Sequence, residues 1–123
     1  MPSVRERAGE AHRRTVEAEI QKIARYLEEA LGRNLVAYIA DVDPKAVGRW
    51  ANGDRSPRRE AEDRLRAAYQ VFQLLQEEES PHTVRAWFIG MNPQLDDAAP
   101  ASTLKEGRLR DVLVAARSYI SGG

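Results

Sequence analysis

Residues 35–57 read LVAYIADVDPKAVGRWANGDRSP, and this stretch contains two short helical patterns separated by a turn. Val36 and Ala37 precede Ala40 by four and three residues, so the three side chains share one face of a first helix. Because Ala37 is small, a second helix can cross close to this face. The pattern stops at Asp41, which predicts a tight turn there in the left-handed conformation that Asp tolerates better than most residues.

A second short helix is predicted from its end signals and its apolar face. Asp43 can accept a hydrogen bond from a free amide as N-cap, and Pro44 at the first helical position loses nothing by lacking an N–H. Val47 and Trp50 lie three residues apart and point back at the first helix, and Gly53 suits the backbone conformation that often ends a helix. The two helices predict a helix-turn-helix, with a helical hairpin that makes no DNA contact as the alternative.

The charge of this region favours DNA binding. Residues 34–59 hold five basic and three acidic residues, whereas residues 60–123 hold seven basic and ten acidic ones. A local basic excess on a chain without net charge suits DNA binding that is modest for one copy. The outer face of the second helix is expected to present Lys45, Ala46, Gly48 and Arg49. We predict DNA contacts from six polar side chains: Lys45, Arg49, Asn52, Arg55, Arg58 and Arg59.

The rest of the chain carries helical rather than alternating apolar patterns, which predicts an all-α fold. Apolar residues recur every three or four positions over residues 15–31, 58–78, 81–89, 100–106 and 108–119. Residues 1–14 are polar and patternless, so we predict a disordered N-terminus. A helical region over residues 15–79 would then be followed by a smaller one over residues 80–123.

Composition narrows the class of protein. The 123 residues include no cysteine, which excludes disulfides and thiolate metal sites and is compatible with a reducing cytoplasm. No apolar run is long enough to span a membrane, and the first residues lack the apolar core of a secretory signal. The sequence has no H-E-x-x-H, nucleophile–base or phosphate-cradling Gly-rich pattern. We therefore expect a cytoplasmic protein that is not an enzyme and needs no metal or cofactor.

Residues 84–123 carry the most specific pattern in the chain. Its landmarks, in order, are Trp87, Asn92, Leu95, Pro100, Leu104, Gly107, Val112 and Leu113. They resemble the toxin-binding domain of the Xre/MbcA/ParS antitoxin family, and the preceding VDPKAVGRWANGDRSP is similar to the helix-turn-helix of that family. Two features depart from the family pattern. Asp96 and Asp97 stand where many members have two glycines, and the segment between Leu104 and Val112 is one residue shorter than in many relatives.

The resemblance implies both an architecture and a function. The architecture is an Xre-like helix-turn-helix core followed by a small helical toxin-binding domain. Family members pair with a RES-domain toxin, an enzyme that depletes NAD⁺; they cover its active site and often repress their own operon. The resemblance therefore implies an antitoxin whose partners are a RES-domain toxin and operator DNA, assembled as a homodimer and as a hetero-oligomer with the toxin.

The C-terminal end offers a means of covering such an active site. It combines an aromatic residue, an aliphatic residue, small residues and a terminal carboxylate. An aromatic anchor at a helix end is a good candidate for a binding hot spot, whereas the alternative is a frayed terminus packed on the core. With the resemblance, we expect toxin contacts from Trp87, Asn92, Arg117, Tyr119, Ile120, Ser121, Gly122 and Gly123. The alternative function is a stand-alone transcriptional regulator whose C-terminal region serves dimerisation.

Overall fold

The computed structural model describes residues 1–122, and over these residues the chain is helical without any strand. The helices follow in the order α1 (Val4–Leu31), α2 (Arg33–Ala40), α3 (Pro44–Asn52), α4 (Arg59–Gln76), α5 (Pro81–Ile89), the 3₁₀ helix η1 (Pro93–Leu95), α6 (Pro100–Lys105) and α7 (Leu109–Ile120). The predicted all-α fold is confirmed.

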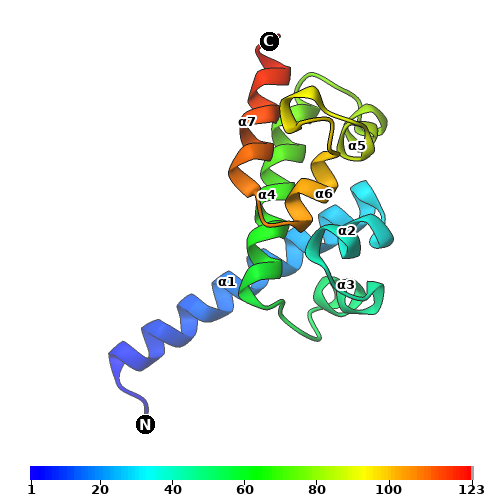
Figure 1. The fold of residues 1–123 in the computed structure, drawn as a ribbon. Coiled ribbons are helices and arrows are strands. Elements are labelled where there is room, and N and C mark those ends of the chain that lie inside the picture. Colours follow the sequence, from blue (N-terminus) through cyan, green and yellow to red (C-terminus); the bar gives the residue numbers. More distant parts are fainter. Residues whose placement is uncertain (123) are drawn as a thin grey trace.

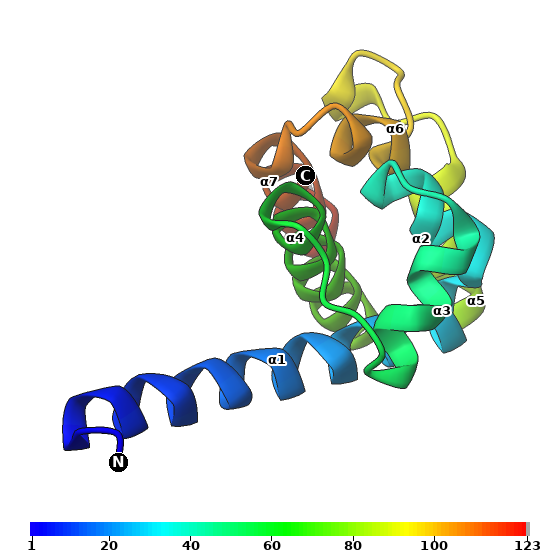
Figure 2. The same cartoon turned by 90° about the horizontal axis from the view of Figure 1, so that it is seen from below.

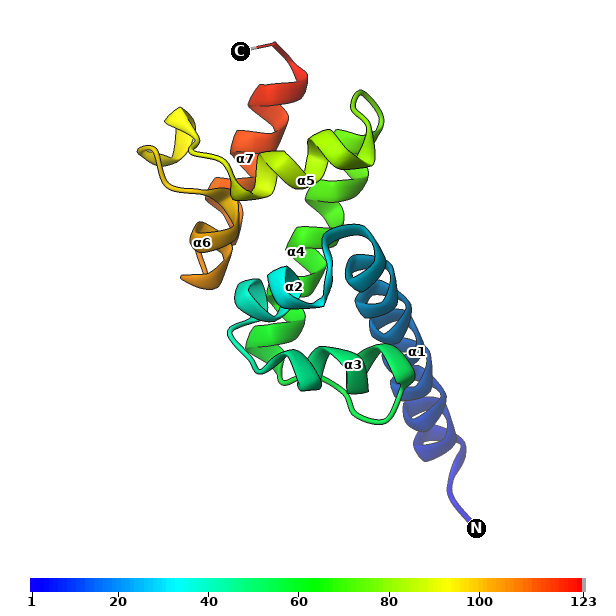
Figure 3. The ribbon, with the colours of Figure 1, turned by 90° about the vertical axis from the view of Figure 1, so that its right-hand side faces the viewer.

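The helices form one body from which part of α1 projects. α4 and α7 run side by side, and the chain ends at the far end of α7 (Figure 1). α2 and α3 pack on each other and on α1 (Figure 3). α6 packs against both α2 and α7, so it joins the first half of the chain to the C-terminal helices.

The two helices and the turn predicted over residues 35–57 are present as α2 and α3. α2 ends at Asp41, which adopts the left-handed conformation with φ 60°. Asp43 caps α3 by accepting a hydrogen bond of 2.8 Å from the backbone amide of Lys45. Gly53 ends α3 at φ 80°, a conformation that glycine adopts without strain.

The N-terminus is helical, so the prediction of disorder over residues 1–14 is wrong. Ser3 and Glu6 form a capping box: the Ser3 hydroxyl accepts from the Glu6 amide at 3.1 Å, and the Ser3 amide donates to the Glu6 carboxylate at 3.3 Å. The first half of α1 nevertheless projects from the body, and Ile20 is its first buried side chain (Figure 2). The polar pattern reflects a lack of burial rather than disorder. The helix forms because Ser3 and Glu6 cap its start and because it continues into the half of α1 that packs on the body.

A single hydrophobic core runs through the helical body. Each of the seven α-helices contributes a fully buried apolar side chain: Leu27, Ile39, Val47, Phe72, Phe88, Leu104 and Val112. The regions expected over residues 15–79 and 80–123 therefore share one core.

Aromatic rings form a continuous row through this core. Tyr26 of α1 meets Phe72 of α4 edge-on, with 5.6 Å between ring centroids, and Phe72 stacks on Phe88 of α5 at 6.4 Å. Phe88 meets the neighbouring Trp87 at 5.6 Å. Trp87 meets Tyr119, near the end of α7, at 6.5 Å. The row thus connects the first helix to the last one.

Replacing Trp50 by Ala should lower the free energy of unfolding by about 3–5 kcal/mol, because it empties a site in the core. Trp50 is 5% exposed and belongs to the central cluster. Urea unfolding followed by circular dichroism measures the loss. Val114→Ala is the control, because Val114 is 48% exposed and its truncation should change stability by less than about 0.5 kcal/mol. A wild-type unfolding midpoint for Trp50→Ala would contradict the packing described for α3.

Candidate functional site

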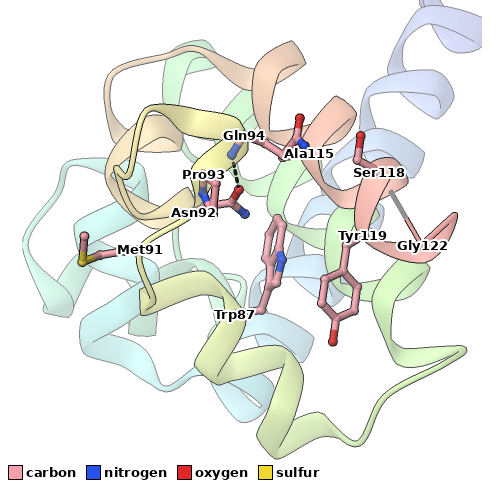
Figure 4. A pocket seen from close by; sticks show the side chains of 9 residues that line it. All are labelled: Trp87, Met91, Asn92, Pro93, Gln94, Ala115, Ser118, Tyr119 and Gly122. Atoms are coloured by element: carbon pink, nitrogen blue, oxygen red, sulfur yellow. Dashed lines mark hydrogen bonds between the residues drawn. The ribbon is translucent and has the colours of Figure 1, made fainter.

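The C-terminal half of the chain contains an open groove of about 570 Å³. It lies between the end of α5, the segment around η1 and the end of α7 (Figure 4). Its lining residues are Trp87, Met91, Asn92, Pro93, Gln94, Ala115, Ser118, Tyr119 and Gly122. Four residues expected to contact a toxin, namely Trp87, Asn92, Tyr119 and Gly122, are therefore brought together in one groove.

Asn92 fixes the loop that forms one wall of the groove. Its side-chain oxygen accepts a hydrogen bond of 2.9 Å from the Gln94 amide, which caps η1. Its backbone amide donates to the Ala98 carbonyl at 3.1 Å, across the loop. Asp96 and Asp97 follow with φ of 55° and 68°, the left-handed region that glycine adopts most readily. Asp tolerates this region better than most residues, so the loop can form here without glycine.

Tyr119 is positioned by an aromatic contact and a hydrogen bond. Its ring packs against Trp87, and its hydroxyl donates to the Glu79 carboxylate at 2.7 Å. The hydrogen bond to Glu79 raises the pKa of the Tyr119 phenol, and partial desolvation and the negative charge of Glu79 raise it further. The side chain is still 43% exposed, so it remains available to a partner.

Three other residues expected to contact a toxin, Arg117, Ile120 and Ser121, do not line the groove. Ile120 is half-buried and packs against the core, which corresponds to the alternative of a C-terminal end packed on the core. Arg117 is exposed on α7. Ser121 is exposed, and its hydroxyl donates to the Ser118 carbonyl at 3.2 Å. Gly123 lies outside the described residues.

Met91 is a groove residue that the sequence analysis missed. It is 78% exposed, and Ile89 beside it is 61% exposed. Large apolar side chains gathered on a surface mark a binding region more often than single ones do. The available signal was a methionine between Gly90 and Asn92, in a segment with no helical pattern of its own.

All six residues expected to contact DNA are exposed. Lys45, Arg49 and Asn52 lie on the outer face of α3. The remaining three, Arg55, Arg58 and Arg59, are exposed in the linker that follows α3 and at the start of α4. Arg55 and Arg58 also border a polar hollow of about 620 Å³ beside the turn between α2 and α3.

Two positions on α3 differ from the prediction. Gly48 was expected to face outward, but it is buried beneath the side chain of Arg33. Ala46 is half-buried and packs against the core. Helical periodicity assigns both residues to the outer face, because it contains no information on the Arg33 side chain that covers Gly48.

Neither a metal centre nor a membrane span stands out among the described residues. Over residues 1–122, no three His, Asp or Glu side chains gather where they could hold a metal ion. None of the helices described there combines the length and the apolar character needed to cross a bilayer.

Glu79→Gln should lower the pKa of Tyr119 towards the ordinary tyrosine value, because a neutral amide is a weaker acceptor. Since the folded-state pKa is raised, the stabilisation from this contact is fully present below the ordinary tyrosine pKa. It is lost as the pH rises through the raised value. An NMR titration with ¹³C-labelled tyrosine measures the shift, with Glu77→Gln as an exposed control. An unchanged Tyr119 pKa in Glu79→Gln would contradict the assigned cause.

Comparisons with known proteins bear on this fold. No family model matches the chain, and no curated protein matches it. Among solved structures, it is similar to a chain in the crystal structure of the M. tuberculosis MbcT-MbcA toxin-antitoxin complex. The two chains are 26% identical with a TM-score of 0.72, and the similarity covers 83% of this chain and 94% of that one. The similarity supports an MbcA-like antitoxin fold, while the wider resemblance to Xre and ParS members stays a prediction.

Proposed function

We propose that this chain is the cytoplasmic antitoxin of a toxin–antitoxin pair and that it binds and occludes a RES-domain toxin that degrades NAD⁺. The similarity to a chain of a toxin-antitoxin complex supports the antitoxin role. The RES-domain partner follows from the resemblance of residues 84–123 to a toxin-binding domain.

The observation that carries the proposal is the convergence of Trp87, Asn92, Tyr119 and Gly122 on one groove. The groove combines aromatic walls with a few polar groups, which is the composition of a protein-binding hot spot. Trp87 is half-buried and held by two ring contacts, so it presents a preorganised surface at low entropic cost. Because Gly122 borders the same groove, one toxin could contact the groove and the C-terminal tail together.

Removing groove side chains should weaken toxin inhibition without unfolding the antitoxin. Tyr119→Ala should cost on the order of 2–4 kcal/mol of binding, or about 30- to 1,000-fold in affinity, if Tyr119 is a central anchor. Met91→Ala should also weaken binding, while Val114→Ala, which alters α7 outside the groove lining, should not. NAD⁺ consumption by the enzyme encoded beside this chain measures inhibition, and circular dichroism verifies folding.

Two outcomes of this assay separate the groove from the tail. Full inhibition by folded Tyr119→Ala and Met91→Ala would contradict the role of the groove. A chain truncated after Ile120 keeps Tyr119 and the packed Ile120 and removes only Gly122 from the groove lining, so it tests the last three residues. Normal inhibition by that chain would assign occlusion to the groove rather than to the last residues.

We further propose that α2 and α3 bind operator DNA and repress the operon, as a homodimer that doubles the phosphate contacts. The exposed Lys45, Arg49 and Asn52 on one face of α3 support this role. The alternative, a stand-alone regulator, would use the same DNA surface but would need no toxin. It is favoured only if no toxin gene lies beside this one.

Arg49→Ala should weaken binding to the native promoter, because it removes a cation from the exposed face of α3. Changing both Arg58 and Arg59 to Ala should make the plot of log binding constant against log salt concentration less steep. The slope should fall by about one unit for each phosphate that the variant no longer neutralises. Fluorescence anisotropy with labelled promoter DNA measures both effects. If neither the free protein nor the toxin complex binds at low salt, the repressor role is refuted while the antitoxin role stands.

A further inference from the structure

The side chain of Arg33 fills the space that a side chain at position 48 of α3 would take. A Cβ built on Gly48 would lie 3.0 Å from Cζ and Nη2 of Arg33 and 3.3 Å from Nη1. These nearly equal distances mean that the guanidinium plane lies across the α3 backbone at this residue. Arg33 is the first residue of α2, so a side chain from the first helix of the pair covers the second helix.

A carboxylate of α1 holds Arg33 in this place. Its Nε lies 2.8 Å from an oxygen of Glu28, and this ion pair is partly exposed, with side-chain exposures of 51% for Arg33 and 23% for Glu28. Among the described residues, neither terminal nitrogen of Arg33 has a hydrogen-bond acceptor within the protein. The guanidinium is therefore fixed through one edge, while the donors on its other edge remain free for an external acceptor.

Two exposed hydrogen-bond donors of α3, Lys45 and Asn52, lie near the residue that Arg33 covers, and Lys45 adds a positive charge that offsets the Glu28 carboxylate. Lys45 precedes Gly48 by three residues and Asn52 follows it by four, so both lie on the same face of α3, one turn away on either side. Both side chains are exposed. Arg33 thus completes a row of hydrogen-bond donors along the outer face of α3. A planar guanidinium with two free donors matches the oxygens of a phosphate.

We propose that Arg33, seated on Gly48, contacts a backbone phosphate of DNA. The inference rests on the proposed DNA-binding role of α2 and α3. A phosphate fits better than a base edge, because the first helix of such a pair crosses the DNA backbone while the second helix enters the groove. The Glu28 carboxylate restrains the guanidinium before DNA arrives, which reduces the conformational entropy lost on binding.

The test measures binding of the full-length protein to two labelled duplexes of equal length, namely the native promoter fragment and a random sequence. Arg33→Ala should weaken binding to both about tenfold. It should also reduce the slope of log binding constant against log salt concentration by about one unit per bound copy, between about 50 and about 200 mM salt. Arg110→Ala removes the same charge from an exposed site on α7 and should leave both quantities unchanged.

Gly48→Ala tests the contact between Arg33 and Gly48 without changing any charge. The added methyl group would lie 3.0 Å from the guanidinium and push it away by a few tenths of an ångström, so binding to both duplexes should weaken, but less than in Arg33→Ala, while thermal unfolding shows a folded protein. In a chain that already carries Arg33→Ala, the same change should have no further effect, because the group it displaces is gone.

Each other result overturns the inference in a distinguishable way. Wild-type affinity, or tighter binding, in Arg33→Ala would mean that Arg33 makes no phosphate contact or obstructs α3. A loss confined to the promoter duplex would indicate a base contact instead. Failure of the wild-type protein to bind either duplex at low salt would refute the DNA-binding role as well, while toxin inhibition, measured separately, would report on the antitoxin role.

Discussion

The row of aromatic rings from Tyr26 to Tyr119 is the interaction that holds the two halves of the molecule in one body. Phe72 and Phe88, at its centre, are almost completely inaccessible to solvent. Each buried aromatic side chain removes about 150–250 Å² of surface from water, and edge-on or offset ring pairs add to that gain. Because Trp87 belongs to the same row, the side of the groove that Trp87 forms is positioned by the core.

Polar contacts at the end of α3 complete this arrangement. Gln21 and Arg25 of α1 both donate to the carbonyl of Ala51, at 3.3 and 3.1 Å. Carbonyl groups in the last turn of a helix have no partner within the helix and carry partial negative charge, so side-chain donors stabilise them. Gly53 lies two residues after Ala51, and a Cβ there would lie 2.9 Å from the Gln21 amide nitrogen. α1 therefore determines how closely α3 can approach and which of its faces stays exposed.

The groove and the outer face of α3 lie at different ends of the molecule. The end of α7, which borders the groove, lies far from α3 in two perpendicular views (Figures 1 and 3). The groove lining contains no residue of α3. The two proposed binding surfaces therefore do not overlap, and both are built on the same core.

Sequence alone determined the features that depend on neighbouring residues. The cap at Asp43, the glycine at the end of α3 and the three-to-four residue apolar spacing predicted nearly all helices, because each signal acts within one or two turns. Only the tertiary structure decided that Gly48 lies under Arg33, that Ile120 packs inward and that Met91 joins the groove. These outcomes depend on contacts between residues far apart in the chain, which helical periodicity does not contain. The same limit applies to α1, where a polar pattern indicated an unburied segment but could not show that a cap and a packed continuation keep it helical.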